Sequence, residues 1–530
     1  MVRTHRRAIR AVALVAGAGL AFALAPGGPA NAAPAQKGCD TRTNATVQAL
    51  LECVRAGGAV EHLEALQAIA DANGGTRAAG TQGYEDSVDY VVDTLRAAGW
   101  DVSIDEFPFT YVGPSTLQQL TPVNATYPTG PYTGSGAGDL TAAVTPVDLQ
   151  LGLGNTSSSG CEATDFAGFT AGTIALIQRG TCAFADKAVN AEAAGAAGVV
   201  IFNQGNTAAA DRQELIVGTL GGSDVVGIPV VGASYAQGVA LAQAGSTAKV
   251  FVPEPEQRPQ KNVIAELRGV NDNNVVMAGA HLDSVQAGPG INDNGSGSAS
   301  LLEIAQNMAK NKPQNTVRLA WWGAEEAGLV GSTEYVAGLS QAEKDRIALY
   351  LNFDMVASPN YIFMVYDGDE SGFEAPVIVP DGSVAIEDLF ESYFTKVGRP
   401  YDDAEFSGRS DYQAFINNGI PAGGLFTGAE VPKNEEQQAI WGGVAGEAFD
   451  QCYHQACDTI DNVNLEALDV NIDAIALAVL AYSYSTQAVN GVTGVPVPGG
   501  LKLPAPAGPQ ESWSSGGGGL AHDHGVGPNA

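Results

Sequence analysis

The chain has 530 residues, so we expect two or three domains rather than one. Apolar residues make up 45% of the composition, which is ample for sizeable hydrophobic cores. The formal net charge of −32 repels phosphate backbones, so the composition argues against nucleic acid as a partner. The simplest interpretation of this acidity is a soluble surface.

The N-terminus has the pattern of a secretory signal peptide. Residues 1–10 are basic, residues 11–25 are apolar but short for a membrane span, and small side chains at 30–32 offer a cleavage point. We therefore expect residues 1–32 to be removed and the protein to be secreted; an uncleaved anchor is the alternative. Arg6-Arg7 leaves open whether export follows the Sec or the twin-arginine route. No later run is apolar enough to span a membrane, so we expect no membrane partner.

Residues 40–111 predict helices followed by a strand. Leu63, Leu66 and Ile69 recur at helical spacing, and a second helical pattern closes at Gly99. Residues 101–111 alternate like a strand. We assign 40–111 to the N-terminal part of a domain that resumes at residue 256.

Residues 112–255 have a different texture and predict an inserted, β-rich domain. They are rich in Gly, Ala, Thr and Val, with strand-like runs at 173–177 and 198–202 and a helix at about 184–196 between them. Residues 251–261 contain three Pro and are predicted to form the exit linker.

Residues 256–490 predict an α/β sheet covered by helices on both faces, because strand-like and helical runs alternate. The strands are expected at 275–280, 317–322, 348–353 and 422–426, and the helices at 298–311, 386–396, 411–417 and 465–484. In such sheets, sites form beyond the carboxyl ends of the strands. Residues 491–530 are rich in Pro and then Gly, and we predict a disordered tail.

Six cysteines follow the signal peptide, and an even number in an exported chain predicts disulfides. They form near neighbours along the chain: Cys39 and Cys53, Cys161 and Cys182, and Cys452 and Cys457. We expect three local disulfides, although spacing alone leaves the connectivity open. The absence of a C-x-x-C pattern argues against a cysteine-rich zinc site.

Five residues near the ends of apolar runs carry metal-binding chemistry: His281, Asp293, Glu326, Asp354 and His454. Two imidazoles and three carboxylates are the ligand inventory for a pair of zinc-like ions, so metal-assisted hydrolysis is the leading hypothesis. Each residue alone is a weak signal; Asp293, for example, also suits a helix cap.

Further residues beside these five can assist catalysis. Glu325 and Glu326 directly follow an apolar strand, where one can bind a metal while the other takes a proton from the attacking water. Tyr453 adjoins His454, and its phenol can donate to a developing oxyanion. Asp283, two residues after His281, can orient that imidazole.

Taken together, these segments resemble the M28 family of secreted, co-catalytic zinc aminopeptidases, in particular its bacterial leucine-aminopeptidase-like branch. The matching pieces are AHLDS, INDNGSGSAS, WWGAEEAGLVGS, YLNFDM, FSGRSDY and CYHQACD. The resemblance implies two Zn²⁺ ions, the N-termini of peptides as substrate, and a preference for large apolar first residues. It leaves a calcium requirement open, and we expect a monomer.

The resemblance also implies a role for each site residue. His281, Asp293 and Asp354 resemble the ligands of one ion, and Asp293, Glu326 and His454 those of the other, with Asp293 bridging. Glu325 matches the general acid/base, Tyr453 the residue that steadies the tetrahedral intermediate, and Asp283 the acid behind His281. Arg409, in FSGRSDY, is expected at the substrate pocket.

The insertion is similar to the protease-associated (PA) domain over GTIALIQRGTCAFADKAVNAEAAGAAGVVIFNQ. The expected organisation is therefore a peptidase domain in two parts, 40–111 and 256–490, with a PA-like domain at 112–255. Two other functions stay open. One is a carboxypeptidase or other amidohydrolase on the same scaffold, and the other is a non-catalytic binding homologue.

Overall fold

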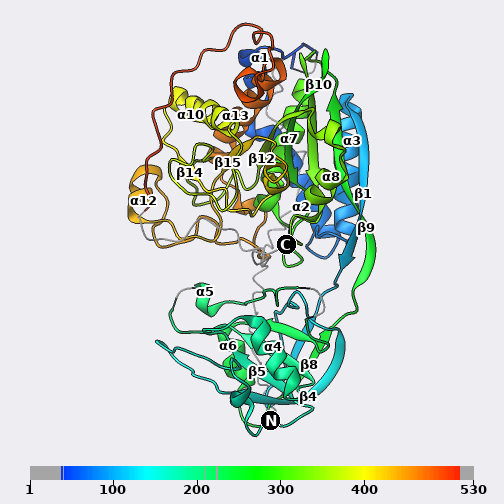
Figure 1. Cartoon of the computed structure of the whole chain (residues 1–530), viewed down its shortest axis with the longest axis vertical. Coiled ribbons are helices and arrows are strands. Elements are labelled where there is room, and N and C mark those ends of the chain that lie inside the picture. The colour runs from blue at the N-terminus through cyan, green and yellow to red at the C-terminus, as the bar shows by residue number, and fades with distance from the viewer. Residues whose placement is uncertain (1–37, 40, 209, 223–224, 514–530) are drawn as a thin grey trace, which may run out of the picture. The chain divides into compact units, whose positions relative to one another are not determined.

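The structure is a computed structural model that describes residues 38–39, 41–208, 210–222 and 225–513 (Figure 1). The predicted signal peptide and residues 514–530 lie outside the described residues. Within the described part, no helix combines the length and the apolar character that crossing a membrane requires.

An eight-stranded mixed sheet forms the frame of the larger part of the chain. Its order is β1 (Asp101–Tyr111), β9 (Glu256–Leu267), β11 (Asn315–Trp322), β10 (Asn271–His281), β12 (Ile347–Phe353), β15 (Ala422–Phe426), β13 (Met364–Tyr366) and β14 (Asp402–Ala404). The central strands β11, β10, β12 and β15 run parallel, whereas β9 is antiparallel to its neighbours β1 and β11. The four strands predicted after residue 262 are confirmed.

Helices cover both faces of this sheet, as the alternation of strands and helices predicted. One face carries α3 (Gln82–Ala98), α7 (Ser296–Met308), α10 (Ser383–Val397) and α13 (Leu465–Tyr484), with α2 (Ala56–Ala72) packed on α7 (Figure 1). The other face carries α8 (Val330–Gly338) and α11 (Tyr412–Ile416). The mixed α/β fold class is therefore confirmed.

Two consecutive tryptophans of β11 contribute to separate hydrophobic cores on the two faces of the sheet. Trp321 belongs to the core under α7 and α13, and Trp322 to the core under α11. Side chains alternate along a strand, so consecutive indoles point to opposite faces. Each is fully buried, and burying an indole of about 200 Å² stabilises the fold by roughly 5 kcal/mol as an upper estimate.

The helix boundaries follow from local chemistry. Thr81 caps α3 by accepting the Tyr84 N–H, and Gly99 ends the helix in the left-handed conformation, with φ 101°. Asn464 caps α13 in the same way as Thr81. Helix α13 is buried along most of its length, which explains why its apolar residues are not confined to one stripe.

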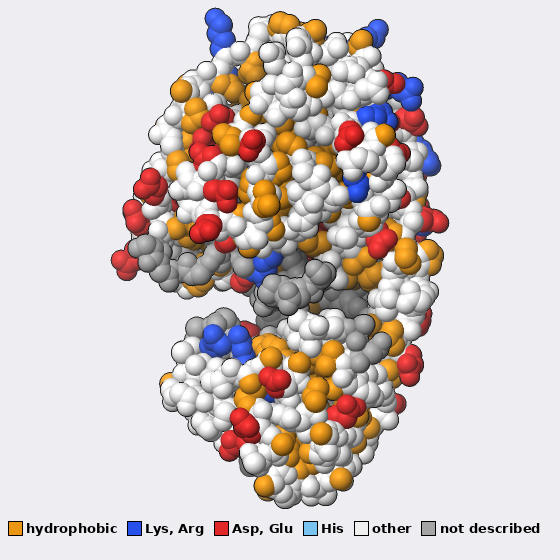
Figure 2. Space-filling model, viewed as in Figure 1, with side chains coloured by type: hydrophobic (Ala, Val, Ile, Leu, Met, Phe, Trp, Pro, Cys, Tyr) orange, Lys and Arg blue, Asp and Glu red, His pale blue; other side chains and the backbone are white. Residues whose placement is uncertain are grey.

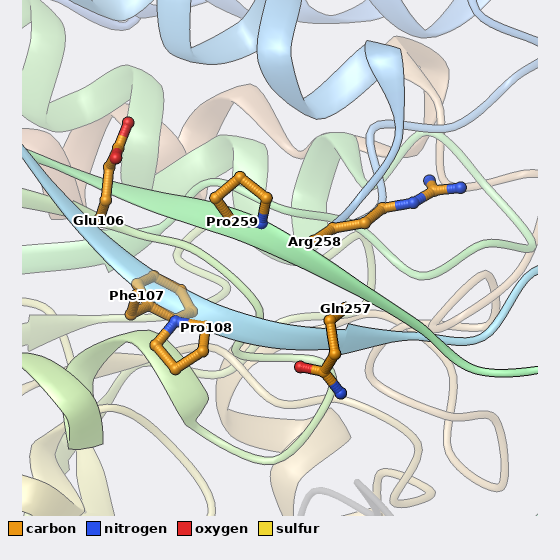
Figure 3. A pocket seen from close by; sticks show the side chains of 6 residues that line it. All are labelled: Glu106, Phe107, Pro108, Gln257, Arg258 and Pro259. Carbon is orange, nitrogen blue, oxygen red and sulfur yellow. The ribbon is translucent and has the colours of Figure 1, made fainter.

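The prediction of a linker at 251–261 is wrong, because strand β9 begins at Glu256 and its residues from Glu256 to Glu266 pair with the whole of β1. Pro259 faces Pro108, and β11 joins β9 only between Val263 and Leu267. Residues 256–261 are therefore half of a two-stranded ribbon, where proline does not interrupt a further ladder. The same ribbon lines a pocket of about 320 Å³. Its lining side chains, drawn in Figure 3, include none of the candidate metal ligands.

A second sheet is built from residues between 116 and 252. Its order is β3 (Ala125–Tyr127), β2 (Thr116–Thr121), β8 (Thr247–Val252), β4 (Gly138–Val147), β5 (Ile174–Gln178), β6 (Gly198–Phe202) and β7 (Val230–Ala233). The helices α4 (Phe184–Ala193) and α6 (Tyr235–Leu241) accompany it. The two strands and the intervening helix that the sequence predicted here are confirmed.

Short elements complete the described chain: α1 (Val47–Leu51), α5 (Ala210–Gln213), α9 (Gln341–Lys344), α12 (Glu435–Trp441) and α14 (Gln487–Asn490), with single turns η1 (Ala163–Phe166), η2 (Ile291–Gly295) and η3 (Ile460–Asn462). Acidic side chains are spread over the displayed face of the molecule in Figure 2, in keeping with the strongly negative net charge.

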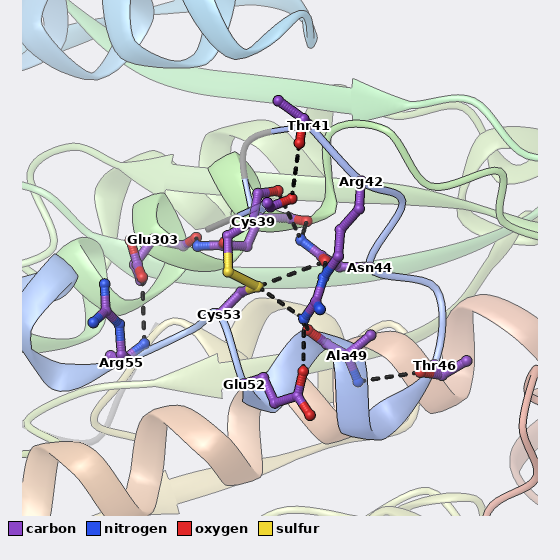
Figure 4. Close-up of a disulfide and its surroundings, with 12 residues drawn as sticks. Cys39, Thr41, Arg42, Asn44, Thr46, Ala49, Glu52, Cys53, Arg55 and Glu303 are labelled. Carbon is purple, nitrogen blue, oxygen red and sulfur yellow. Dashed lines mark hydrogen bonds and ion pairs between the residues drawn. A yellow bond between two sulfur atoms is a disulfide. The ribbon is translucent and has the colours of Figure 1, made fainter. Parts of the chain in front are cut away.

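All three disulfides join the near neighbours that the cysteine spacing suggested: Cys39–Cys53, Cys161–Cys182 and Cys452–Cys457. Figure 4 shows the first of them beside Arg42. The Arg42 guanidinium donates to the Ala49 carbonyl at 2.8 Å and to Glu52 at 2.9 Å. The segment before α1 is thus tied, both covalently and by these hydrogen bonds, to α1 and the residues directly after it.

The described part of the predicted disordered tail, residues 491–513, instead follows a defined course. Val497 is buried in the core under α13, and Trp513 packs its ring near Phe373 and Phe449. The Gly508 N–H donates to the Tyr401 hydroxyl at 2.8 Å. The prolines prevent a helix here, but scattered apolar side chains between them still anchor the segment.

Candidate metal centre

Three parallel strands deliver the first candidate residues to one edge of the sheet. His281 is the last residue of β10, Asp354 directly follows β12, and Glu325 lies three residues after β11. His281 pairs in register with Trp322, so the carboxyl ends of these strands coincide. All three side chains are almost completely buried, which is costly for charged groups unless something cationic meets them.

Asp283 links His281 to the glutamate pair. Its two carboxylate oxygens accept the backbone N–H groups of Glu325 and Glu326, at 3.2 and 3.4 Å, and one oxygen lies 3.7 Å from the His281 Nδ1. Nδ1 also lies 3.1 Å from the Asp283 backbone carbonyl. The imidazole therefore presents Nε2 to the site, as a ligand held from behind does.

Asp293 lies in the turn η2, where the Gly-rich loop enters α7. Gly290 needs its left-handed conformation, φ 62°, and a Cβ there would lie 2.4 Å from the Asp293 carbonyl oxygen. The Asp293 carboxylate is not the cap of α7; the Gly297 N–H at that helix start donates to the Asn294 side chain, at 3.1 Å. Instead, Asp293 is 3% exposed and lies between the two histidines.

The short loop between Cys452 and Cys457 carries Tyr453 and His454. The disulfide closes this loop, and the Tyr453 ring stacks on the His454 ring with their centroids 3.8 Å apart. Tyr453 is 8% exposed, so the pair is held at the margin of the buried site.

The distances divide the predicted ligands into two sets that share Asp293. The His281 Nε2 lies 3.3 Å from Asp293 Oδ1 and 3.2 Å from Asp354 Oδ1. The His454 Nε2 lies 3.3 Å from the other Asp293 oxygen, Oδ2, and 3.0 Å from Glu326 Oε2. The structure thus brings all five predicted ligands together, with one Asp293 oxygen turned toward each histidine.

These separations suit metal ions. Zinc–nitrogen and zinc–oxygen bonds of about 2.0–2.2 Å in a tetrahedron place two ligand atoms about 3.3–3.6 Å apart, close to the separations found here. The Glu325 Oε2 lies farther from the His281 Nε2, at 3.9 Å. The donor set, two imidazoles and carboxylates without thiolate, is also one that zinc accepts.

Electrostatics point the same way. Burial disfavours the protonated imidazole of His281, yet Asp354, Glu325 and further carboxylates hold its pKa well above the usual value. Burial likewise disfavours the protonated imidazole of His454, yet Glu326 and Asp293 hold its pKa well above the usual value. Burial first, and then the neighbouring carboxylates, raise the pKa of Glu325 well above its usual value. The centre concentrates negative charge and attracts cations.

Three residues without glycine's freedom adopt left-handed backbone conformations beside the candidate ligands. They are Ala324 (φ 58°), Met355 (φ 55°) and His454 itself (φ 57°). Such conformations cost of order 1–3 kcal/mol each and persist where the surrounding structure imposes them. Their gathering around Glu325, Asp354 and His454 marks a site whose geometry is held against local preference.

The sequence analysis missed several residues that support the site. Asp458 accepts the backbone N–H groups of Asn292 and Asp293, at 2.9 and 3.0 Å. The Ser410 hydroxyl donates to Asp354 Oδ2 at 2.7 Å. The only sequence signal for them is that both lie inside the motifs FSGRSDY and CYHQACD.

A buried arginine supports the loop between β10 and η2 and was also missed. The Arg77 side chain donates to the carbonyls of Leu282, Pro289 and Gly290. It is fully buried, and burial lowers its pKa to about 10. Nothing in its local sequence distinguishes it from a surface arginine.

Arg409, the expected pocket residue, adjoins Ser410 in the loop before α11. Its charge acts on the Glu405 carboxylate, and its backbone N–H donates to the Tyr412 hydroxyl at 3.3 Å. These contacts place it in the same loop as a partner of Asp354. A contact with substrate stays a prediction.

Comparison with known proteins identifies two families that match parts of this chain and relatives that match most of it. Residues 262–479 match peptidase family M28, and residues 140–241 match the PA domain. The chain is 53% identical over 450 residues to an aminopeptidase of Pseudomonas aeruginosa, covering 83% of each. It is 40% identical over 432 residues to leucine aminopeptidase 2 of Trichophyton rubrum, covering 80% of this chain and 83% of that one.

A solved structure, that of a zinc aminopeptidase from Bacillus subtilis, resembles the fold with a TM-score of 0.63 at 27% identity. The match covers 80% of this chain and 94% of that one. The chain belongs to peptidase family M28, and it carries a PA domain. Both predicted resemblances are confirmed, while the exact limits of the domains stay predictions.

Proposed function

We propose that the protein is a secreted aminopeptidase that removes N-terminal residues, preferably large apolar ones, with two zinc ions. The observation that carries the proposal is the pair of ligand sets joined through the two oxygens of Asp293. We assign His281, Asp293 and Asp354 to one ion and Asp293, Glu326 and His454 to the other. The names of the relatives support aminopeptidase activity and, for one of them, leucine as the residue removed.

The chain's own residues then have distinct tasks. The ions, when bound, supply Lewis acidity that polarises a carbonyl and lowers the pKa of water toward neutrality. Glu325 takes the proton of the attacking water and delivers it to the leaving amine; its fully buried carboxylate and raised pKa suit a group that holds a proton in transit. Tyr453 donates its hydroxyl proton as a hydrogen bond to the oxygen that becomes negative.

Substrate selection follows from charge. The carboxylates of the centre attract the free α-ammonium group of a peptide, so a blocked N-terminus loses its main contact. A carboxypeptidase would instead need a basic residue to receive the substrate carboxylate, and Arg409 is the candidate that the sequence analysis singled out. We favour the aminopeptidase because the groups gathered at the centre are overwhelmingly acidic.

Removing the metal tests the whole proposal. Dialysis against a chelator should abolish hydrolysis of leucyl-p-nitroanilide, and added zinc should restore it while metal analysis finds two equivalents per chain. Full activity in metal-free protein, or full activity with a single equivalent, would reject the two-ion mechanism.

Exchanging Glu325 tests the proton transfer. Glu325→Gln should keep both zinc ions yet lower kcat by about 10²–10⁴-fold, the usual contribution of general acid–base catalysis. Glu334→Gln, an exposed glutamate on α8, is the matched control and should leave kcat unchanged. A Glu325→Gln enzyme of near-normal kcat would remove Glu325 as the base.

A panel of substrates separates the remaining alternatives. Leucyl-p-nitroanilide should be cleaved, whereas its N-acetylated form and substrates with only a free carboxyl terminus should resist. Rapid cleavage of the latter would favour the carboxypeptidase, and binding without any cleavage would favour the non-catalytic homologue. We further propose that the protein acts as a monomer, with a PA-like domain at 112–255 inserted between the two parts of the peptidase domain.

A further inference from the structure

A second group of carboxylates in the described part of the chain shares no residue with the metal centre. We call it the acidic cluster; it comprises Asp367, Asp369, Glu387, Glu391 and Asp403. One oxygen from each of Glu387, Glu391 and Asp403 lies within 4.8 Å of the others, and Asp367, Asp369 and Glu387 form a second such set. Because Glu387 belongs to both sets, the cluster is continuous. All of its members except Asp369 are buried.

The fold assembles this cluster from separate elements. Glu387 and Glu391 lie one turn apart on α10 and therefore share a face of the helix. Asp403 lies on the edge strand β14, and Asp367 directly follows β13, the parallel neighbour of β14. Like charges from three elements are thus brought together although they repel one another.

Backbone amides satisfy only part of this charge. Asp367 Oδ2 accepts the N–H groups of Gly372 and Phe373, at 2.9 and 2.8 Å. Glu387 Oε2 accepts those of Gly368 and Asp369, at 3.1 and 3.0 Å. These bonds shape the loop after β13 around the carboxylates but bring in no positive charge.

Asp403 has an unsatisfied carboxylate oxygen. Its side chain is 3% exposed, and its Oδ1 accepts no hydrogen bond from the described residues. No Lys or Arg of the described chain forms an ion pair with Asp403, Glu387 or Glu391. The strongest electrostatic influences on these three groups come from other carboxylates. A buried carboxylate without a partner is unfavourable, so the cluster calls for a cation.

We propose that the acidic cluster binds a calcium ion, held by Glu387, Glu391 and Asp403 with Asp367 and Asp369 beside it. An all-oxygen donor set without His or Cys suits a hard cation rather than zinc. Calcium–oxygen distances of about 2.3–2.6 Å allow two ligands of one ion to lie up to about 5 Å apart, which the cluster satisfies. Magnesium usually takes only one or two carboxylates, fewer than are gathered here.

Burial and the repulsion between like charges both disfavour the ionised carboxylates of the cluster. Burial, and then the neighbouring carboxylates, raise the pKa of Glu387 to about 9 and that of Asp403 to about 8. The same causes raise the pKa of Glu391 to about 7.

Equilibrium dialysis with ⁴⁵Ca²⁺ on the zinc-loaded, full chain tests the proposal. The parent protein should bind calcium with a dissociation constant below about 1 mM. Glu387→Gln should weaken this site by at least about 30-fold, although Gln still offers an oxygen to the Gly368 and Asp369 N–H groups. Asp381→Asn, an exposed acid two residues before the same helix, removes the same charge and should leave binding unchanged.

Asp403→Asn provides a second, independent variant in case Glu387→Gln folds poorly, and it should lose the same equivalent of calcium. Calcium should also raise the melting temperature of the parent and of Asp381→Asn, but not that of either cluster variant. The proposal is overturned if the parent binds no calcium, if Glu387→Gln and Asp403→Asn bind as many equivalents as the parent, or if magnesium binds this site more tightly. Because the cluster contains none of the proposed zinc ligands, failure of the aminopeptidase assay would leave this test intact.

Discussion

Asp458 offers the sharpest test of how the metal centre is held in place. Its Oδ1 accepts the Asn292 N–H at 2.9 Å and the Asn462 side-chain amide at 3.0 Å, while its Oδ2 accepts the Asp293 N–H at 3.0 Å. Burial and the adjacent Asp450 carboxylate raise the pKa of Asp458 to about 8. The hydrogen bonds nevertheless show that both oxygens of this side chain act as acceptors, one on each side.

Asp458→Asn replaces one of the two acceptor oxygens with an NH₂ group. If the amide oxygen keeps the two bonds of Oδ1, the NH₂ group faces the Asp293 N–H, and that buried donor loses its acceptor. An unsatisfied buried donor costs about 1–3 kcal/mol, so we expect a loss of about 2 kcal/mol in the free energy of unfolding. The carboxylate of Asp293, which we propose as the bridge between the two ions, should be displaced at the same time, and metal affinity should fall by about 10–100-fold.

Two measurements check this expectation. Urea unfolding of the metal-free protein gives the stability difference, and competition with a chromogenic zinc chelator gives the metal affinity. Asp461→Asn is the matched control because Asp461 is exposed and lies in the same short segment. If Asp458→Asn matches this control in both measurements, Asp458 does not position Asp293.

Two further predictions concern stability. Burial lowers the pKa of His62 to about 4, against 6.5 for an unperturbed imidazole. Between these pH values the unfolded chain binds a proton that the folded chain does not. The contribution of the neutral, buried imidazole to the free energy of unfolding is therefore complete above pH 6.5 and is lost as the pH falls toward 4. The pH-dependent contribution is about 3 kcal/mol. His62→Gln should therefore flatten the dependence of the free energy of unfolding on pH between pH 4 and 6.5. An unchanged slope would show that His62 is not a buried, neutral imidazole. Replacing Cys452 and Cys457 by Ser opens a short loop, with a sequence separation of 5, and should cost about 2 kcal/mol while weakening zinc binding. Replacing Cys39 and Cys53, separated by 14, should cost more, about 3 kcal/mol, yet leave zinc binding unchanged; equal zinc affinities in the two double variants would show that the loop needs no covalent closure.

Much of the architecture could be predicted from the sequence because it depends on local patterns of apolar and polar residues. The apolar runs that become β10, β11 and β12 end in His281, a glutamate pair and Asp354. Parallel strands bring their carboxyl ends to one edge, so candidate ligands far apart in the chain could be expected to meet. Helix α13 was predicted with its correct bounds because its cap and its apolar residues are adjacent in sequence.

Errors arose where a segment's conformation depends on a distant partner. Residues 256–261 were interpreted as a linker from their prolines, whereas pairing with β1, more than a hundred residues earlier, makes them a strand. Residues 491–513 were predicted to be disordered from their composition, yet contacts with Tyr401 and Asp402 order them. Composition describes what a segment does alone and carries no information about the surface on which it packs.

The same division applies to the two sites. Residue chemistry alone, two imidazoles among carboxylates, predicted a metal centre, because ligand type is a property of each side chain. The direction of each Asp293 oxygen and the support from Asp458 depend on how loops far apart in the chain meet, and the fold alone specifies that meeting. The acidic cluster is the clearest case, since Glu387 and Asp403 become neighbours only when α10 packs against β13, the strand that pairs with β14.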